Sequence, residues 1–175
     1  ATCTASAIAP KIAVTAAHCL VLPRGSQLVA ALLVLDTDFT RVIEEVNNND
    51  LSHVRVVTKA KRHENYLKGR GTDNDIGLIG FDVALPADFK LAQVADAQVA
   101  RTLRKGTAVT LAGFGVEKYQ LQKDPVTGRL SPAGSGDGLL RQIDGIRVLS
   151  LTATGEEITL DQSQGRGACH GDSGG

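Results

Sequence analysis

The chain has 175 residues, 19 basic and 19 acidic side chains, and 42% hydrophobic residues, so one ordinary domain with an apolar core can form. The balance of charge provides no basic surface for nucleic acid and no polybasic patch for anionic membranes. No apolar run approaches the roughly 18 residues that a helix needs to cross a bilayer, and the longest run, 28–35, has the length of a strand.

Both ends of the chain are unusual for a complete protein. It starts at Ala1 and contains no methionine, and it stops at Gly174 and Gly175, directly after the candidate nucleophile Ser173. Because a chain terminus is normally packed or solvated rather than set within a half-built site, we expect the chain to be a fragment that lacks both ends. The absence of a signal peptide is then no argument against secretion.

Three cysteines, Cys3, Cys19 and Cys169, make an odd number. In an oxidising compartment this count suggests one disulfide and one cysteine whose partner is missing. Cys3 and Cys19 flank a short strand-like segment and can pair locally, which would leave Cys169 alone. Three buried free thiols in a cytosolic protein are the alternative that the composition leaves open.

Short apolar or β-branched runs follow one another along the chain, separated by glycine, proline, aspartate and asparagine. We predict strands at residues 12–14, 28–35, 54–57, 107–111, 143–151 and 158–160. Runs of this length, bounded by turn residues, favour an all-β protein built as a sandwich or a barrel.

The segments between these runs are of three kinds. Residues 47–50 form a polar turn cluster, and residues 118–138, rich in glycine and proline, predict a long mobile loop. Residues 88–103 are the one stretch with an arguable helical pattern, and helix is the less favoured interpretation there. The strand pattern pauses over residues 86–105, which suggests a boundary between two halves of the chain.

The strongest chemical signal is the segment Cys169-His-Gly-Asp-Ser-Gly-Gly175. A serine hydroxyl is a poor nucleophile at neutral pH, and it needs a base and also donors for the oxyanion that it creates. Glycines around Ser173 allow the tight turn that aims backbone N–H groups inward, so Gly171 and Ser173 would form an oxyanion hole. A glycine-rich turn with an incidental serine is the alternative.

Two further segments supply the partners that such a serine needs. His18 lies in Val14-Thr-Ala-Ala-His-Cys19, and an ordinary histidine can take and return a proton near neutral pH, although most lone histidines have no such role. Asp75 stands at the head of an apolar strand, where a carboxylate needs a hydrogen-bonding partner such as a histidine Nδ1–H. Asp73 is the competing assignment, and an Asp-Asn-Asp cluster is more often a turn.

Taken in chain order, these histidine, aspartate and serine segments resemble the catalytic triad of the trypsin/chymotrypsin family of serine proteases. The likeness extends to the sequence between them. Phe114 stands where the family's Val-Ala-Gly-Trp-Gly segment has tryptophan. Residues 3–10 resemble the family's strand before the histidine, and residues 62–66 resemble its loop before the aspartate. Residues 110–115 resemble the tryptophan segment, and residues 139–142 resemble the strand after the family's autolysis loop.

The resemblance implies an all-β fold of two perpendicular antiparallel β-barrels of the chymotrypsin type, both incomplete in this chain. Residues 1–95 would form the first barrel and carry His18 and Asp75. Residues 96–175 would form the second barrel and carry Ser173. The three side chains would meet in the cleft between the barrels and hydrolyse peptide bonds through an acyl-enzyme.

The resemblance also assigns roles around the nucleophile in a secreted protease made as a zymogen. Asp172 matches the family residue that pairs with the new α-amino group after zymogen cleavage, and this ion pair orders the oxyanion hole. Gly167 occupies the main position that selects the P1 side chain, where trypsin-like members carry aspartate. Because Gly167 and Ala168 offer neither charge nor hydroxyl, we predict a preference for uncharged P1 residues. His170 would stand at the pocket mouth, where it would either contact substrate or simply be exposed to solvent.

The chain departs from the family at both ends. The family's Ile-Val-Gly-Gly-like amino terminus is absent, and so is everything after Gly175, including one wall of the primary pocket and the usual partner of Cys169. Barrels that lack strands expose unpaired edges and apolar residues. We therefore expect this chain alone to be poorly stable and to have little or no peptidase activity.

The expected partners are protein or peptide substrates and protein inhibitors of proteases, without nucleic acid, membrane, metal or cofactor. The alternative function is a non-catalytic homologue that binds proteins with the same scaffold, although such relatives usually lose a triad residue and none is lost here. The histidines lack metal-ligand spacing with the cysteines. A calcium-binding loop is conceivable around four acidic residues, but their spacing matches no established pattern. These residues are Asp36, Asp38, Glu44 and Glu45.

Overall fold

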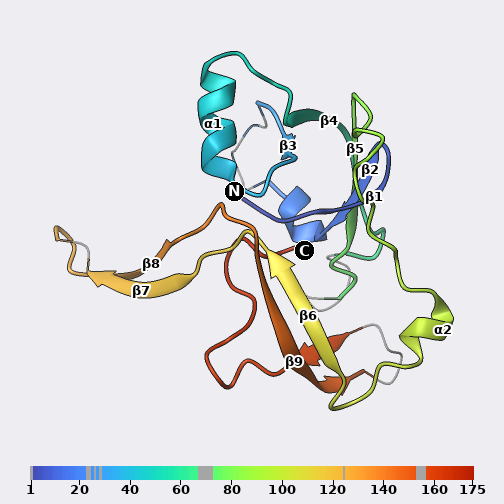
Figure 1. The fold of residues 1–175 in the computed structure, drawn as a ribbon. Coiled ribbons are helices and arrows are strands. Elements are labelled where there is room, and N and C mark those ends of the chain that lie inside the picture. Colours follow the sequence, from blue (N-terminus) through green and yellow to red (C-terminus); the bar gives the residue numbers. More distant parts are fainter. Residues whose placement is uncertain are drawn as a thin grey trace.

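Strands make up most of the regular structure (Figure 1). The computed structural model describes residues 2–22, 25, 27, 29–66, 73–123, 125–152 and 157–175. In chain order the elements are β1 (Ser6–Ala9), β2 (Ile12–Thr15), a 3₁₀ helix (Ala17–Leu20), β3 (Leu32–Val34), α1 (Phe39–Asn47), β4 (Val54–Arg62), β5 (Gly77–Phe81), α2 (Ala97–Ala100), β6 (Ala108–Gly113), β7 (Lys118–Lys123), β8 (Leu130–Ser135), β9 (Arg141–Leu151) and β10 (Ile158–Leu160). The prediction of an all-β fold is confirmed. Neither α-helix in the described ranges has the length and apolar character that crossing a bilayer would require.

The first sheet has five strands in the order β1-β2-β5-β4-β3, and all neighbours are antiparallel. Successive side chains of a strand point to opposite faces, so Ile79 and Phe81 of β5 are buried while Leu78 is exposed. The buried side chains at the centre of this sheet form a small core of Ala13, Ile79, Phe81 and Leu85. This core fixes β2 and β5 side by side.

The second sheet has three antiparallel strands in the order β10-β9-β6. Its central strand β9 buries Ile146 and Val148 and leaves Arg147 between them exposed. The strands predicted at residues 107–111, 143–151 and 158–160 all lie in this sheet. β6 is important for the site because it ends at Gly113, and the residues that follow, Gly115 and Val116, hydrogen bond to the loop that contains Ser173.

The prediction of a long loop over residues 118–138 is wrong, because β7 and β8 pair there as an antiparallel hairpin. Figure 1 shows this hairpin extending away from the rest of the molecule. Its register places Pro132 opposite Leu121. Proline lacks an N–H but is accepted in a two-stranded ribbon, since each strand there has one unpaired edge. Glycine and proline content therefore indicated a loop where a ribbon forms.

The sequence interpretation also misses α1, the longest helix of the described residues. Phe39, Val42, Ile43 and Val46 recur at helical spacing, and Val42 is almost fully buried. Asp38 caps the helix by accepting hydrogen bonds from the backbone N–H groups of Thr40 and Arg41. The side-chain hydrogen bond from Thr40, assisted by these backbone bonds, lowers the pKa of Asp38.

The segment between the two sheets has little regular structure. Of the stretch with an arguable helical pattern, residues 88–103, only α2 is helical, and Asp96 caps it. Residues 6–81 contain all strands of the first sheet, and residues 108–160 contain those of the second sheet and of the hairpin. The division into two barrels at residue 95 stays a prediction.

Two sets of backbone contacts join the regions of the two sheets. At the start of α1, the Phe39 N–H donates to the Gly138 carbonyl at 2.7 Å, and the Leu140 N–H donates to the Thr37 carbonyl at 2.8 Å. Near the amino terminus, the Thr4 N–H donates to the Ser173 carbonyl at 2.9 Å. The second contact brings the end of the chain against the segment that leads into β1.

Candidate active site

His18 lies in the 3₁₀ helix that directly follows β2. The residues before it are small and buried: Ala16 is 7% exposed and Ala17 is fully buried, so the backbone can pack tightly behind the imidazole. The His18 side chain itself is 45% exposed, so a substrate can reach it. Burial of the flanking alanines thus fixes the histidine while leaving its ring open to solvent.

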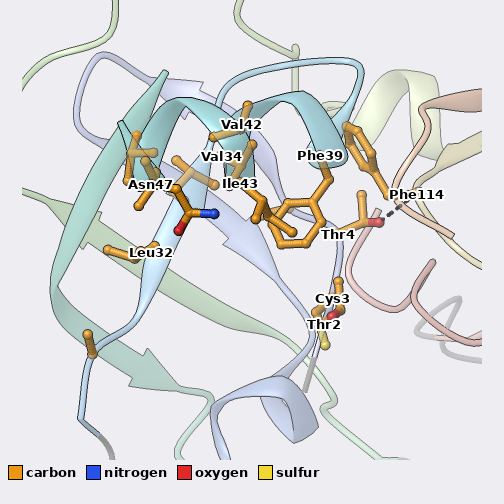
Figure 2. A pocket seen from close by; sticks show the side chains of 16 residues that line it. Thr2, Cys3, Thr4, Leu32, Val34, Phe39, Val42, Ile43, Asn47 and Phe114 are labelled. Carbon is orange, nitrogen blue, oxygen red and sulfur yellow. Dashed lines mark hydrogen bonds between the residues drawn. The ribbon is translucent and has the colours of Figure 1, made fainter. Parts of the chain in front are cut away.

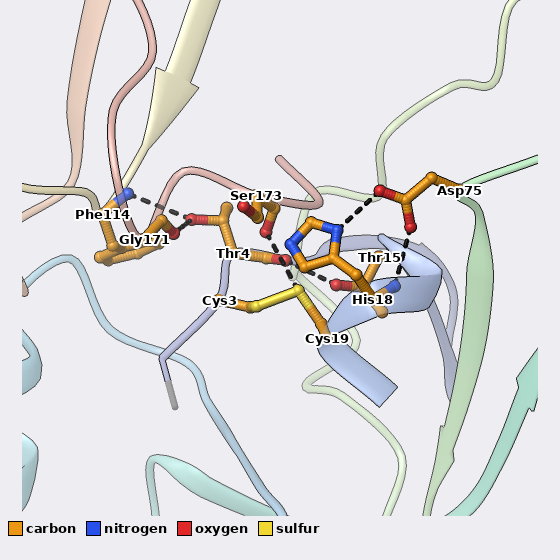
Figure 3. Close-up of a disulfide and its surroundings, with 9 residues drawn as sticks. All are labelled: Cys3, Thr4, Thr15, His18, Cys19, Asp75, Phe114, Gly171 and Ser173. Atoms are coloured by element: carbon orange, nitrogen blue, oxygen red, sulfur yellow. Dashed lines mark hydrogen bonds and ion pairs between the residues drawn. A yellow bond between two sulfur atoms is a disulfide. The ribbon is translucent and has the colours of Figure 1, made fainter. Parts of the chain in front are cut away.

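Asp75 holds His18 through two hydrogen bonds (Figure 3). Its Oδ2 lies 2.6 Å from His18 Nδ1, and its Oδ1 accepts the His18 backbone N–H at 2.8 Å. The two residues are 57 positions apart, and the antiparallel pairing of Thr15 with Gly77 brings their segments together. A carboxylate can only accept, so the imidazole places its proton on Nδ1 and leaves Nε2 as a base. Asp75 makes this bond, and the competing Asp73 lies at the preceding turn.

Ser173 lies in the loop that follows Cys169, and its backbone contacts Cys19, the residue after His18 (Figure 3). Its carbonyl accepts the Thr4 N–H, and Cys19 Sγ lies 3.8 Å from the same oxygen. The sulfur belongs to a disulfide and carries no proton, so this second approach is a packing contact. Within the part of the chain that the structure describes, the Ser173 hydroxyl makes no hydrogen bond to His18. The site therefore has a formed His18–Asp75 pair with Ser173 next to it.

A disulfide between Cys3 and Cys19 ties the segment before β1 to the 3₁₀ helix of His18. The Cα atoms are 6.3 Å apart, within the usual range for such a bond. Cys3, Cys19 and His18 also form the one group of potential metal ligands among the described residues. Because the two sulfurs are bonded to each other, neither is a thiolate that could bind a metal. Cys169 is a half-buried free thiol.

Three of the four acidic residues considered as a calcium loop are engaged with protein groups. Asp36 pairs with Arg41, and Glu45 accepts a hydrogen bond from His53 Nδ1 at 2.8 Å. Asp38 caps α1. These contacts give the carboxylates a structural role around α1.

The loop from Cys169 to Gly175 depends on glycines and on Asp172. Gly171 and Gly174 have φ of +97° and +88°, conformations that favour glycine. The Asp172 carboxylate accepts the backbone N–H groups of Gly115 at 2.7 Å and Cys169 at 2.8 Å. A Cβ at Gly115 would lie 2.5 Å from Asp172 Cγ, so the carboxylate fits there only against a glycine. Asp172 thus fastens the loop to the end of β6.

Two of the three predicted substrate-binding residues line one cavity. Gly167 and Ala168 face a cavity of about 380 Å³, which is also lined by Asp172 and by residues of β6 and β9. No charged side chain stands at position 167, and the Gln162 side chain occupies the space where a Cβ would be. His170 lies outside this lining, and its carbonyl accepts the Val116 N–H at 2.8 Å.

A second cavity, of about 420 Å³, lies between α1, β3 and residues 2–5 (Figure 2). Its walls are mainly apolar, including Leu32, Phe39 and Ile43, and it contains no ionisable side chain apart from the disulfide-bonded Cys3. It therefore offers no acid, base or nucleophile. Thr4 stands in its wall and hydrogen bonds to Phe114 on the side toward the second sheet, a contact that sequence reasoning missed (Figure 2).

Comparison with known families shows the family of the chain. The family model described as Trypsin matches residues 1–175, the whole chain, and the chain belongs to the trypsin family. The family is one of serine-type endopeptidases, enzymes that act on proteins. A search among curated proteins finds no sequence that matches this chain.

Proposed function

We propose that the chain is the catalytic part of a serine endopeptidase, with Ser173 as nucleophile, His18 as general base and Asp75 as the residue that orients His18. The observation that carries the proposal is the 2.6 Å contact between His18 Nδ1 and Asp75 Oδ2, with the Ser173 carbonyl 3.8 Å from the sulfur of the neighbouring Cys19. An exposed histidine held in one tautomer by a carboxylate is the arrangement that acyl transfer requires.

In this mechanism one proton passes from Ser173 to His18 and from His18 to the leaving amine. His18 Nε2 takes the Ser173 hydroxyl proton as Oγ attacks the peptide carbonyl, and Asp75 stabilises the imidazolium that results. The oxyanion receives hydrogen bonds from the N–H groups of Gly171 and Ser173. His18 then protonates the leaving amine. Water attacks the acyl-enzyme in the same way, with His18 again as the base, and releases Ser173. Because Ser173 is not bonded to His18, a side-chain rotation must precede attack, and such a rotation is too fast to limit turnover.

We assign Asp172 the family role of receiving an α-amino group when a zymogen is activated. Its half-buried carboxylate is already held by two backbone N–H groups, which supports a fixed position for that charge. A secreted protein fits the Cys3–Cys19 disulfide, because such bonds persist mainly in oxidising compartments. Protein inhibitors of proteases would be further partners.

The test is covalent labelling with a fluorophosphonate, whose phosphorus is attacked by an activated serine with loss of fluoride. We expect one label per chain, located on Ser173 by peptide mass spectrometry, and no label on Ser173→Ala. Ser135→Ala, a serine in the hairpin strand β8, is the matched control and should label like the unmodified chain. Failure of the folded chain to label at all would favour the alternative, a protein-binding homologue without catalysis.

We further propose that the P1 preference is for uncharged side chains. Gly167 and Ala168 supply no charge to their cavity, whereas an arginine or lysine head group needs a carboxylate partner when it is desolvated. The two carboxylates in the lining already have partners: Asp172 accepts two backbone N–H groups, and Glu117 pairs with Arg141. With a set of peptide p-nitroanilides that differ only at P1, we expect higher kcat/KM for uncharged residues than for arginine or lysine. A clear preference for arginine would contradict this assignment without affecting the roles of His18 and Ser173.

A further inference from the structure

Thr4 connects the first sheet to the loop of the nucleophile through both its backbone and its side chain (Figure 3). It is only 6% exposed. Its N–H donates to the Ser173 carbonyl at 2.9 Å, and its own carbonyl accepts the Thr15 hydroxyl at 2.9 Å. Almost any residue at position 4 could form these backbone hydrogen bonds, so they do not explain why a threonine stands there.

The Thr4 hydroxyl makes two more hydrogen bonds that do require this type of side chain. It donates to the Gly171 carbonyl at 2.8 Å and accepts the Phe114 N–H at 3.2 Å. One oxygen thus joins the nucleophile loop to the segment that follows β6. A valine would keep the shape but would leave a carbonyl and an N–H without partners in a half-buried place.

The peptide that the hydroxyl holds lies between the two proposed oxyanion donors. The Gly171 carbonyl and the Asp172 N–H belong to one peptide plane, and the Asp172 N–H donates to the Cys169 carbonyl at 3.1 Å. The plane is therefore fixed at both sides, by Thr4 and by Cys169. The Gly171 N–H belongs to the peptide before this plane and the Ser173 N–H to the peptide after it, so a shift of the plane would move the backbone that carries both donors.

The methyl group of Thr4 adds packing at the end of the same loop. A Cβ built at Gly175 would lie 2.9 Å from Thr4 Cγ2, so the methyl group stands close against the backbone there. A serine at position 4 would keep the hydrogen bonds and lose only this contact. Serine and valine therefore separate the hydroxyl from the shape of the side chain.

We propose that Thr4 is a positioning residue whose hydroxyl sets the Gly171–Asp172 peptide and, through it, the two oxyanion donors. The inference rests on the proposed peptidase function, and Thr4 itself touches neither substrate nor the reacting atoms. Its effect is on the transition state, where the oxyanion forms, rather than on ground-state binding of substrate.

The test compares Thr4→Val with Thr4→Ser in the full chain. We expect Thr4→Val to lower kcat by about 10- to 100-fold with little change in KM, since small displacements of catalytic groups have effects of this size. Its affinity for a peptide boronic acid, which forms a tetrahedral adduct, should fall in parallel. Thr4→Ser should restore both quantities. If the role of Thr4 were purely structural, kcat would instead fall in both variants, in step with their melting temperatures.

A second measurement does not depend on activity. Hydrogen exchange of the Phe114 amide should be slow in the unmodified chain and in Thr4→Ser, and faster in Thr4→Val. Rapid exchange of this amide in the unmodified chain would overturn the proposal, even if Thr4→Val failed to fold. So would equal kcat values for the two variants. If the folded chain does not react with the fluorophosphonate at Ser173, the peptidase proposal fails, whereas hydrogen exchange still decides whether the Thr4 hydroxyl holds the loop.

Discussion

Replacing Asp75 by asparagine is expected to lower kcat by about 10⁴-fold while leaving KM nearly unchanged. The asparagine oxygen can still accept the His18 backbone N–H, as Asp75 Oδ1 does at 2.8 Å. The amide NH₂ would then face His18 Nδ1, which must accept instead of donate. The imidazole proton moves to Nε2, so the atom that should take the Ser173 proton already carries one. Steady-state kinetics on an uncharged-P1 p-nitroanilide measure the loss.

The matched control for this variant is Asp73→Asn, which makes the same chemical change two residues earlier. Asp75 makes the hydrogen bond to His18, so Asp73→Asn should stay close to the unmodified chain in kcat. An equal loss in the two variants would mean that charge at this turn matters in general, and that Asp75 has no special part in orienting His18. Circular dichroism of both variants checks that the fold is retained.

The local sequence predicted several strands, because burial on one face of a sheet leaves a period of two, but it missed β7 and β8. Of the strand predicted over residues 28–35, residue 28 lies outside the described residues, and only Leu32–Val34 forms a strand. β4, β9 and β10 fall where apolar or β-branched runs occur. α1 was missed although its signal is present: Asp38 stands at the cap, and the apolar residues follow helical spacing. Its Val42, Ile43 and Val46 are β-branched and lower helix propensity, but burial of one face outweighs that cost.

The candidate site shows a different limit of prediction from sequence. The segments around His18, Asp75 and Ser173 could be selected from the sequence because each resembles a family motif. The hydrogen bonds of Thr4 could not, since its hydroxyl meets Gly171 at a separation of 167 residues, and nothing in the local pattern marks residue 4. The position of the Ser173 hydroxyl relative to His18 likewise depends on tertiary packing. Sequence motifs identify the reacting groups, and packing determines which residues hold them in place.

Gly174 follows the proposed nucleophile Ser173, and we expect Gly174→Ala to destabilise the fold by more than about 3 kcal/mol, at the upper end for overpacked sites. A Cβ at this position would lie 2.5 Å from the Thr4 carbonyl oxygen and 2.7 Å from the Ala16 nitrogen, and closer still to Thr15 Oγ1. The first two are backbone atoms of the first sheet region and cannot turn away as a flexible side chain could. Relief requires moving the loop, which carries Ser173 away from His18.

The positive φ of Gly174 also disfavours alanine, and a control separates this backbone effect from the clash. Gly165 has φ of +66°, and no neighbouring heavy atom lies within 4 Å of the place that a new methyl group would take, so Gly165→Ala should cost only about 1 kcal/mol. Urea unfolding followed by far-UV circular dichroism gives both values. Equal stability of the two variants would show that the loop does not pack against Thr4 and Ala16 in solution. In that case the segments of His18 and Ser173 would not be held together, and the proposed triad would lack its structural basis.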